Sequence, residues 1–245
     1  MDSNINLLEE SVSDLCFFEQ PIIHIKNSQE NDRIKEYELL LREKSGTNRF
    51  PASLFMKFVD SDENNEVLMN WLVNEIKSIV EKRPNCTFSF NIDPQQLLFD
   101  STLLQLSKLE PYKESLIIEI TEALPSNRGV MNYYEKTLIN QLEPIYNLGF
   151  RIAVDDVSSG MHSLNTVRKY TDYINRIKLS LIQLKDAGPI ILKETVSLWL
   201  LMARENNTSV VIEGVSSIEL RDYLKCMGVE MQQGFLWGKP ALALV

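Results

Sequence analysis

Short apolar segments alternate with amphipathic segments of helical periodicity along most of this 245-residue chain. Short apolar runs of this kind are typical of buried strands, and apolar residues spaced three or four positions apart indicate helices. About eight such units in one domain favour a closed barrel of parallel strands, with helices outside, over an open sheet. The expected strands cover residues 17–25, 86–92, 115–122, 151–154, 173–179, 208–214 and 229–234, and the expected helices cover residues 66–80, 132–147, 190–204 and 218–227.

Other segments leave their local structure open. Pro21 interrupts the first expected strand, which is therefore expected to be an edge strand or an irregular one, because proline donates no hydrogen bond to a sheet. Residues 34–42 fit a strand or a helix on composition alone, and Asp93-Pro94 is typical of a helix start. The apolar run 196–203 is too short to span a bilayer and predicts a buried helix.

Two adjacent acids, Asp155 and Asp156, directly follow one expected strand. An isolated pair of this kind is more often a strand-ending turn with a helix cap, since Asp is common in both. Here polar residues end several expected strands, and in a barrel the carboxyl ends of the strands face one site. The recurrence therefore favours a functional site, formed by Asn91, Glu119, Asp155, Lys178, Glu213 and Gln233.

Acidic side chains at such a mouth repel each other unless cations offset their charge. Carboxylates and the amide oxygen of Asn91 suit Mg²⁺ or Mn²⁺, and two such ions allow in-line hydrolysis of a phosphodiester. Lys178 could hold the attacking water or stabilise phosphate charge, although a salt bridge at the barrel mouth explains it equally well. His24 and His162 are interpreted as a strand residue and a loop residue, not as ligands or a base. The acids are Glu119, Asp155, Asp156 and Glu213, with Glu38 as a further candidate.

Charge and cysteine content narrow the function further. A net charge of −9 and a pI of about 4.9 argue against a general nucleic-acid binder, whereas cations could still recruit a small phosphorylated substrate. Cys16, Cys86 and Cys226 are far apart, which predicts reduced thiols in a cytoplasmic protein. The N-terminus lacks the pattern of a signal peptide, and no linker divides the chain, so one domain without a membrane segment is expected.

A series of short motifs lies in order along the chain: Gln20-Pro21-Ile22, Glu38-Leu39-Leu40 with Arg42, Phe90-Asn91-Ile92, Glu119-Ile120-Thr121-Glu122, Asp155-Asp156 with Ser163-Leu164, Ile177-Lys178, Glu213-Gly214-Val215, and Gln233-Gly234-Phe235-Leu236 with Lys239-Pro240. Together, from about Phe18 to Pro240, these motifs resemble the EAL family of cyclic di-GMP phosphodiesterases. The resemblance implies an α/β fold, a modified TIM (β/α)8 barrel with an antiparallel first strand. It further implies a stand-alone EAL domain over residues 17–245, after an N-terminal extension of residues 1–16.

The resemblance also implies metal-dependent hydrolysis of cyclic di-GMP to linear pGpG, with two divalent ions, Mg²⁺ or Mn²⁺. In the family pattern Lys178 and Gln233 serve the nucleophilic water, and Glu122 holds the loop after Asp156. The residues implied for the metals are Glu38, Asn91, Glu119, Asp155, Asp156 and Glu213. Those implied for catalysis are Glu38, Glu122, Asp156, Lys178 and Gln233, and those for substrate binding are Gln20, Arg42 and Pro240, with Arg42 on phosphate. A homodimer is expected, with neither polymeric nucleic acid nor a membrane as a partner.

Several positions depart from the family pattern. The segment Val157-Ser158-Ser159 replaces Phe-Gly-Thr, Asn175 and Ser180 replace aspartates, and Ser216 replaces a glutamate. Losses around metal-site residues commonly cost about 10- to 100-fold in metal affinity or activity. The loop after Asp156 is expected to follow a different path, to limit activity, and to lie near a dimer interface that includes the following helix. A catalytically weak domain that acts as a cyclic di-GMP receptor or a protein-binding regulator remains the alternative.

Overall fold

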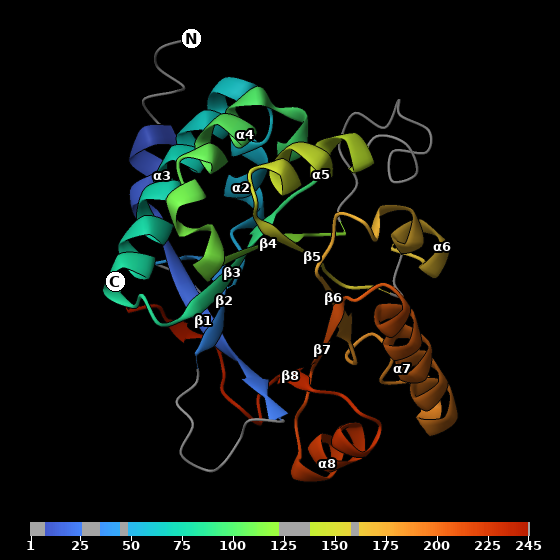
Figure 1. The fold of residues 1–245 in the computed structure, drawn as a ribbon. Coiled ribbons are helices and arrows are strands. Elements are labelled where there is room, and N and C mark those ends of the chain that lie inside the picture. Colours follow the sequence, from blue (N-terminus) through green and yellow to red (C-terminus); the bar gives the residue numbers. More distant parts are fainter. Residues whose placement is uncertain (1–7, 26–34, 45–48, 123–137, 158–161, 245) are drawn as a thin grey trace.

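The computed structural model describes residues 8–25, 35–44, 49–122, 138–157 and 162–244. Strands β1 to β8 close into a barrel, and helices lie around its outside (Figure 1). β2 to β8 run parallel to one another in sequence order, whereas β1 lies between β8 and β2 and is antiparallel to both. This confirms the expected modified (β/α)8 barrel with an antiparallel first strand. The strands are β1 (Leu15–His24), β2 (Glu36–Glu43), β3 (Thr87–Ile92), β4 (Leu116–Ile120), β5 (Arg151–Val154), β6 (Arg176–Ser180), β7 (Ser209–Glu213) and β8 (Met231–Gln233).

β1 has neighbours on both sides, so the expected edge position is wrong. On one side it pairs with β2 through residues 15–21. On the other side Phe18 and Glu19 pair with a short additional strand, β9 (Ala241–Leu242), and residues 22–24 pair with β8. Pro21 falls between these last two stretches, where a residue without an amide hydrogen costs the sheet least. The irregular pairing expected at Pro21 is therefore confirmed.

The helices follow the expected alternation with local differences. α2 was not anticipated, and Asp93-Pro94 leads into a 3-10 turn, η3 (Gln96–Leu98), before α4 begins at Asp100. The Asp93 carboxylate accepts a hydrogen bond from the Gln95 amide at 2.7 Å, which favours a tight turn there over a helix. Residues 132–137 of one expected helix lie outside the described residues. The helices are α2 (Ala52–Phe58), α3 (Asp62–Lys82), α4 (Asp100–Ser107), α5 (Leu138–Asn147), α6 (Leu164–Val167), α7 (Gly188–Glu205) and α8 (Ile218–Cys226), with 3-10 turns η1 (Val12–Asp14), η4 (Glu110–Ser115) and η6 (Arg168–Tyr170).

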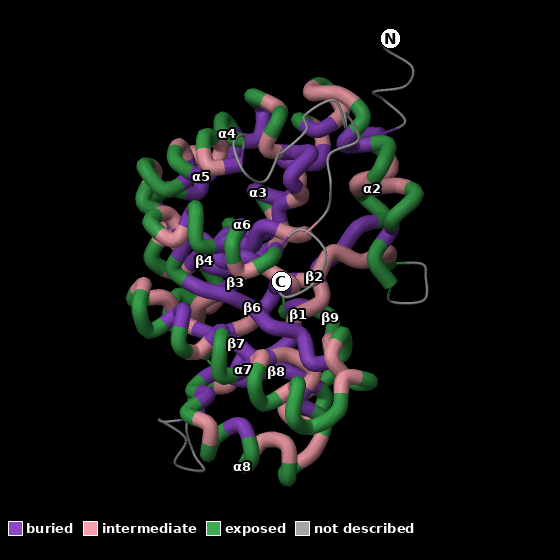
Figure 2. The backbone as a smooth tube through the Cα atoms, turned by 90° about the vertical axis from the view of Figure 1, so that its right-hand side faces the viewer, coloured by how far each residue is buried: buried purple, intermediate pink, exposed green. Residues whose placement is uncertain are grey.

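The core lies between the barrel wall and the helices, and Figure 2 shows the strands mostly buried while the helices present exposed positions. α7 departs from the expected buried helix. Val196 and Trp199 pack into the core, but Ile190, Leu198 and Leu201 are exposed on the other face. The helix is therefore buried on one face only, although apolar side chains lie on both faces. β1 begins at Leu15, before the expected domain start.

A buried ion pair closes the barrel at the amino ends of the parallel strands. The Arg176 guanidinium on β6 donates a hydrogen bond to Glu36 on β2, and His24 Nε2 on β1 lies 2.7 Å from Glu36 Oε2. Burial would raise the pKa of Glu36, but His24 and Arg176 lower it to about 2. Glu36 therefore stays ionised at this end of the barrel, opposite the carboxyl ends of the strands.

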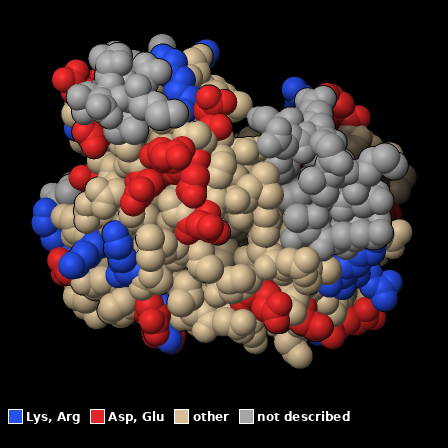
Figure 3. Space-filling view, turned by 90° about the horizontal axis from the view of Figure 1, so that it is seen from above, with Lys and Arg blue, Asp and Glu red and all other residues tan. Residues whose placement is uncertain are grey.

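The surface charge agrees with the low pI. On the face seen in Figure 3, acidic side chains gather near the middle, and Lys and Arg lie in separate groups toward the sides. The described part of this face thus lacks the continuous basic surface that tracks polymeric nucleic acid. Among the described residues, no helix combines the length and the apolarity needed to cross a membrane.

Candidate active site

Lys178 lies at the centre of the barrel mouth and is fully buried. From β6, the side chain reaches carboxylates on β2, β4 and β7 and in the turn after β5. The Nζ atom lies 2.7 Å from Glu119 Oε2, 2.8 Å from Glu213 Oε1, 3.1 Å from Glu38 Oε2 and 3.5 Å from Asp155 Oδ1. Four carboxylates thus share one ammonium group, and the cluster retains an excess of negative charge when they are ionised.

Amide side chains hold Glu38 in this cluster. Asn91 Nδ2 donates to Glu38 Oε1 at 2.9 Å, and Gln233 Nε2 donates to Glu38 Oε2 at 2.7 Å. The same Gln233 nitrogen lies 3.2 Å from Gln20 Oε1, and Gln20 donates to the carbonyl oxygen of Gly238 at 2.9 Å. These contacts join β1, β2, β3 and β8 around a single carboxylate, so its orientation is set by several strands.

The two adjacent acids occupy a tight turn directly after β5. The Asp155 amide donates to the Ile120 carbonyl at 3.0 Å, and the Val157 amide donates to the Lys178 carbonyl at 3.1 Å. Between them Asp156 has a φ of 50°, a left-handed conformation that Asp tolerates better than most residues. Its amide donates to Asp155 Oδ1 at 3.0 Å. Neighbouring strands therefore fix both ends of the turn, which directs the pair over the barrel mouth.

Burial and mutual repulsion shift the ionisation of the cluster. Burial raises the pKa of Glu119 to about 8 although Lys178 opposes the shift, and burial together with Asp155 raises the pKa of Asp156 to about 6. The pKa values of Asp155 and Glu213 are also raised, mainly by burial. Burial would lower the pKa of Lys178, but the four carboxylates raise it well above its usual value. Lys178 is therefore an ammonium and a donor, not a general base.

The arrangement fits divalent cations. Ligand atoms lie within 4.8 Å of one another in two groups that share Asp155. Buried Asn91 Oδ1 and Glu119 Oε1 have no hydrogen-bond partner among the described residues, which is the state expected of oxygens available to a metal. The all-oxygen donor set also suits hard ions such as Mg²⁺, Mn²⁺ or Ca²⁺. The groups are Glu38, Glu119 and Asp155, and Asp155, Asp156 and Glu213.

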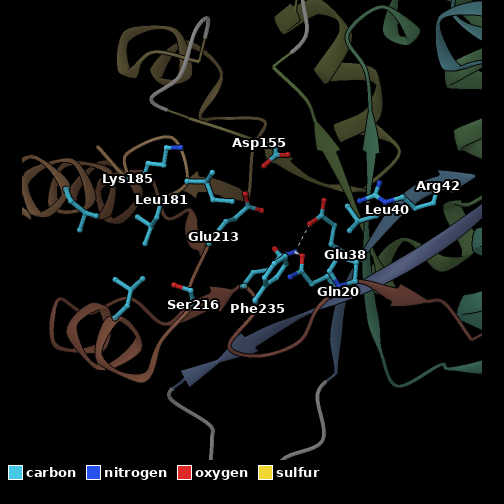
Figure 4. Close-up of a pocket in the computed structure, with 17 residues that line it drawn as sticks. Gln20, Glu38, Leu40, Arg42, Asp155, Leu181, Lys185, Glu213, Ser216 and Phe235 are labelled. Carbon is cyan, nitrogen blue, oxygen red and sulfur yellow. Dashed lines mark hydrogen bonds between the residues drawn. The ribbon is translucent and has the colours of Figure 1, made fainter. Parts of the chain in front are cut away.

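A pocket of about 640 Å³ opens beside this cluster. Figure 4 shows Glu38, Asp155 and Glu213 facing the same space from different strands. The opposite side of the pocket is largely apolar, and Phe235 at its rim is 64% exposed. A polar, acidic wall thus faces an apolar wall, an arrangement suited to a ligand with a charged centre and flat apolar ends. The apolar wall comprises Leu181, Ile182, Leu192, Leu220 and Phe235.

The structure brings together the residues expected at the metal site, with Lys178 and Gln233 among them. Gln20, Arg42 and Pro240 line the same pocket. Glu122 follows β4 and contributes to the raised pKa of Asp156, which agrees with a position near that turn. The loop residues Ser158 and Ser159, which Glu122 was expected to hold, lie outside the described residues.

The structure shows the contacts of Asn175 and the location of Ser216, two of the positions that depart from the family pattern. Asn175 Oδ1 accepts a hydrogen bond from the Ile152 amide at 2.9 Å, so the amide at this position ties β6 to β5. Ser216 lines the pocket. Sequence reasoning set aside His162, which is fully buried against the Asp155 turn, and it gave no role to the apolar wall. An apolar cluster spread over two loops and two helices, α7 and α8, has no periodic signal in a sequence.

The stability of the metal-free protein is expected to fall as pH rises. The folded-state pKa values of Glu119 and Asp156, about 8 and about 6, lie above unfolded values near 4. The folded state therefore binds more protons between about pH 4 and pH 8, and the free energy of unfolding decreases across that window. Differential scanning fluorimetry in chelator should show a decreasing melting temperature. Glu119→Gln should flatten the decline between about pH 6 and pH 8, and Asp156→Asn should make the decline between about pH 4 and pH 6 shallower. A rising or flat wild-type profile contradicts the account.

Comparison with known proteins places these features in one family. The family model described as the EAL domain matches residues 7–240. The probable cyclic di-GMP phosphodiesterase PdeG of Escherichia coli K12 is 29% identical over 181 residues, covering 71% of this chain and 34% of that protein. The chain thus spans about a third of the length of this curated relative.

Solved structures share the fold. A standalone EAL protein from Vibrio cholerae O395, bound to cyclic di-GMP, matches with a TM-score of 0.73 at 21% identity. The match covers 94% of this chain and 93% of the Vibrio chain. The Klebsiella pneumoniae protein BlrP1, in complex with manganese and cyclic di-GMP, matches with a TM-score of 0.72 at 19% identity. The match covers 94% of this chain and 57% of the BlrP1 chain. At these identities the likeness establishes the fold.

Proposed function

The chain belongs to the EAL domain family, and from that premise we propose that it hydrolyses cyclic di-GMP to linear pGpG with two divalent cations, Mg²⁺ or Mn²⁺. The observation that carries the proposal is the set of carboxylates around Lys178 at the barrel mouth, whose ligand atoms form two groups joined at Asp155. The names of the relatives supply the substrate. The structure of BlrP1 in complex with manganese and cyclic di-GMP supports the same pairing of ion and ligand.

Each side chain in the proposed reaction has a distinct task. Bound cations would polarise a phosphate oxygen and lower the pKa of the attacking water. Glu38, oriented by Asn91 and Gln233, holds one of the ligand positions. Lys178 remains an ammonium and donates hydrogen bonds toward the water or the phosphate, where it offsets charge that develops in the transition state.

The pocket shape supports a cyclic dinucleotide as the substrate. Its acidic wall, with bound cations, matches the phosphates, and Arg42 at the polar end adds a guanidinium for a phosphate oxygen. Its apolar wall offers Phe235 and aliphatic side chains to a base. Gln20 on β1 and Pro240 directly before β9, which both line the pocket, complete the proposed substrate contacts.

Turnover distinguishes this proposal from the alternative of a receptor or regulatory domain. Chromatography of cyclic di-GMP incubated with the chain and Mn²⁺ or Mg²⁺ should reveal pGpG, and chelator should stop its formation. The substitutions at Ser180 and Ser216 favour the alternative. Calorimetric binding of cyclic di-GMP without any pGpG, with either ion and across pH 6 to 9, would establish the receptor and overturn the enzyme.

We further propose a homodimer near α6 and the loop before it, through the side of the barrel on which α7 also lies (Figure 1). The exposed apolar side chains of α7 support this, because a monomer rarely leaves so many of them on one helix. Sedimentation velocity should give twice the chain mass, and Ile190→Glu with Leu198→Glu should yield monomers. Lys193→Glu on the same helix is the matched control and should remain dimeric. A wild-type monomer at micromolar concentration contradicts the proposal.

A further inference from the structure

His162 is the one fully buried histidine among the described residues, and it lies beside the two acids of the active site. Its Nδ1 atom lies 2.7 Å from the backbone carbonyl oxygen of Asp155, seven residues earlier in the chain. A carbonyl oxygen only accepts hydrogen bonds, so Nδ1 must carry the hydrogen. The imidazole ring is therefore a donor to the backbone of a proposed metal-site residue.

The Asp155 carbonyl that accepts this hydrogen bond lies just beyond the end of the sheet pairing. β5 ends at Val154, and the carbonyl of Asp155 lies beyond the β5–β6 ladder. The next residue, Asp156, has the left-handed φ of 50°, so this peptide is where the chain changes direction. A buried carbonyl without a donor costs free energy and lets the peptide rotate, which would move both carboxylates.

The residue after His162 anchors the other side of the contact. Ser163 Oγ accepts a hydrogen bond from the Thr166 amide at 3.3 Å and caps α6. His162 thus connects the start of α6 to the Asp155 turn, which is also tied to β4 through Ile120 and to β6 through Lys178. The backbone of this turn is thus hydrogen-bonded to β4 and to β6, and the His162 side chain adds a donor from the segment that leads into α6.

We propose that His162 is a positioning residue, whose Nδ1–H donor to the Asp155 carbonyl holds the Asp155–Asp156 turn in the geometry that binds divalent cations. The inference rests on the proposed function for its consequence in catalysis, but its geometric part stands on the described contacts.

Two substitutions separate the hydrogen bond from the bulk of the ring. The amide nitrogen of asparagine reaches about as far as Nδ1, so His162→Asn should keep the donor. The amide of glutamine reaches as far as Nε2 and should not supply it. Calorimetric titration of chelator-stripped protein with Mn²⁺ should show about 10- to 100-fold weaker binding in His162→Gln, and near-wild-type binding in His162→Asn. Turnover of cyclic di-GMP at limiting Mn²⁺ should follow the same order.

His24→Asn is the matched control, since the chain has two histidines and His24 lies at the opposite end of the barrel. It should leave Mn²⁺ affinity unchanged whatever it does to the melting temperature. Long-range ¹H–¹⁵N spectra of the two rings should identify His162 in the Nδ1–H form. The amide signals of Asp156 and Val157 should shift in His162→Gln and stay near their wild-type positions in His162→Asn.

Different outcomes of these measurements overturn the positioning role and the proposed function. Equal loss of Mn²⁺ affinity in both His162 variants, or loss in neither, overturns the positioning role. A wild type that binds Mn²⁺ with the expected Asn–Gln difference but forms no pGpG overturns the proposed function and keeps the positioning role. If the wild type binds no Mn²⁺ at all, the proposed function fails, and the amide shifts alone decide whether His162 holds the turn.

Discussion

Replacing Glu38 with alanine is expected to abolish hydrolysis of cyclic di-GMP, with kcat lowered by about 10³-fold or more. Glu38 contributes to one of the two groups of proposed ligands and lies 3.1 Å from Lys178 Nζ. Its loss removes a proposed cation ligand and leaves the donors of Asn91 and Gln233 without the Glu38 carboxylate that accepts from them. Cation charge at a phosphate contributes several kcal/mol to the transition state, and each ~1.4 kcal/mol is a factor of ten in rate.

Glu43→Ala on the same strand is the matched control for Glu38→Ala. Glu43 is the last residue of β2 and lies outside the pocket lining. It should retain wild-type kcat, and both variants should have circular dichroism spectra like that of the wild type. Retention of more than about a tenth of wild-type kcat in Glu38→Ala, at saturating Mn²⁺, would remove Glu38 from the cation site.

Replacing Lys178 with methionine is expected to affect both stability and turnover. Methionine fills a similar volume but leaves the four carboxylates without their buried ammonium group. Breaking a buried ion pair from one side typically costs about 3–5 kcal/mol. In chelator the melting temperature should fall by about 6 °C or more, given about 2–4 °C per kcal/mol for a chain of this size. Mn²⁺ should restore most of that loss, because cations then neutralise the carboxylates.

Measuring turnover distinguishes two roles of Lys178, which are to balance the charge of the carboxylates and to donate hydrogen bonds near the phosphate. In Lys178→Met, kcat should remain at least about 10²-fold below wild type even when Mn²⁺ has restored stability, since a charged donor near the phosphate is gone. Lys77→Met, on the exposed face of α3, is the control and should change neither quantity. Full kcat in the stable, Mn²⁺-loaded variant would assign Lys178 to charge balance alone.

The barrel itself was predictable because each strand has its own local pattern. β5 is a short apolar run that an acid follows directly, β7 is one that ends in an acid, and helices with apolar spacing follow or precede both strands. β2 is an exception, because residues 34–42 fit a helix or a strand equally well and their structure was left open. The resemblance supplied the antiparallel direction of β1, because no local pattern distinguishes it.

What the sequence did not reveal depends on contacts between distant residues. Arg176 and Glu36 are 140 positions apart, and no periodicity joins them. His162 contacts a backbone carbonyl, which leaves no trace in the residue types around it. Pro21 read as an edge signal because the change of neighbour from β9 to β8 is a property of the closed barrel. The residues at the strand ends were identifiable from the sequence, because a barrel brings the carboxyl ends of its strands together at one site.

The central claim is that the carboxylates around Lys178 hold divalent cations that hydrolyse cyclic di-GMP. The most direct measurement titrates chelator-stripped protein with Mn²⁺ while recording both bound ion, by electron paramagnetic resonance, and the initial rate of pGpG formation. The account predicts no pGpG without metal and a rate that rises with occupancy toward two ions per chain. Metal-independent formation of pGpG, or full Mn²⁺ occupancy without pGpG, would contradict it.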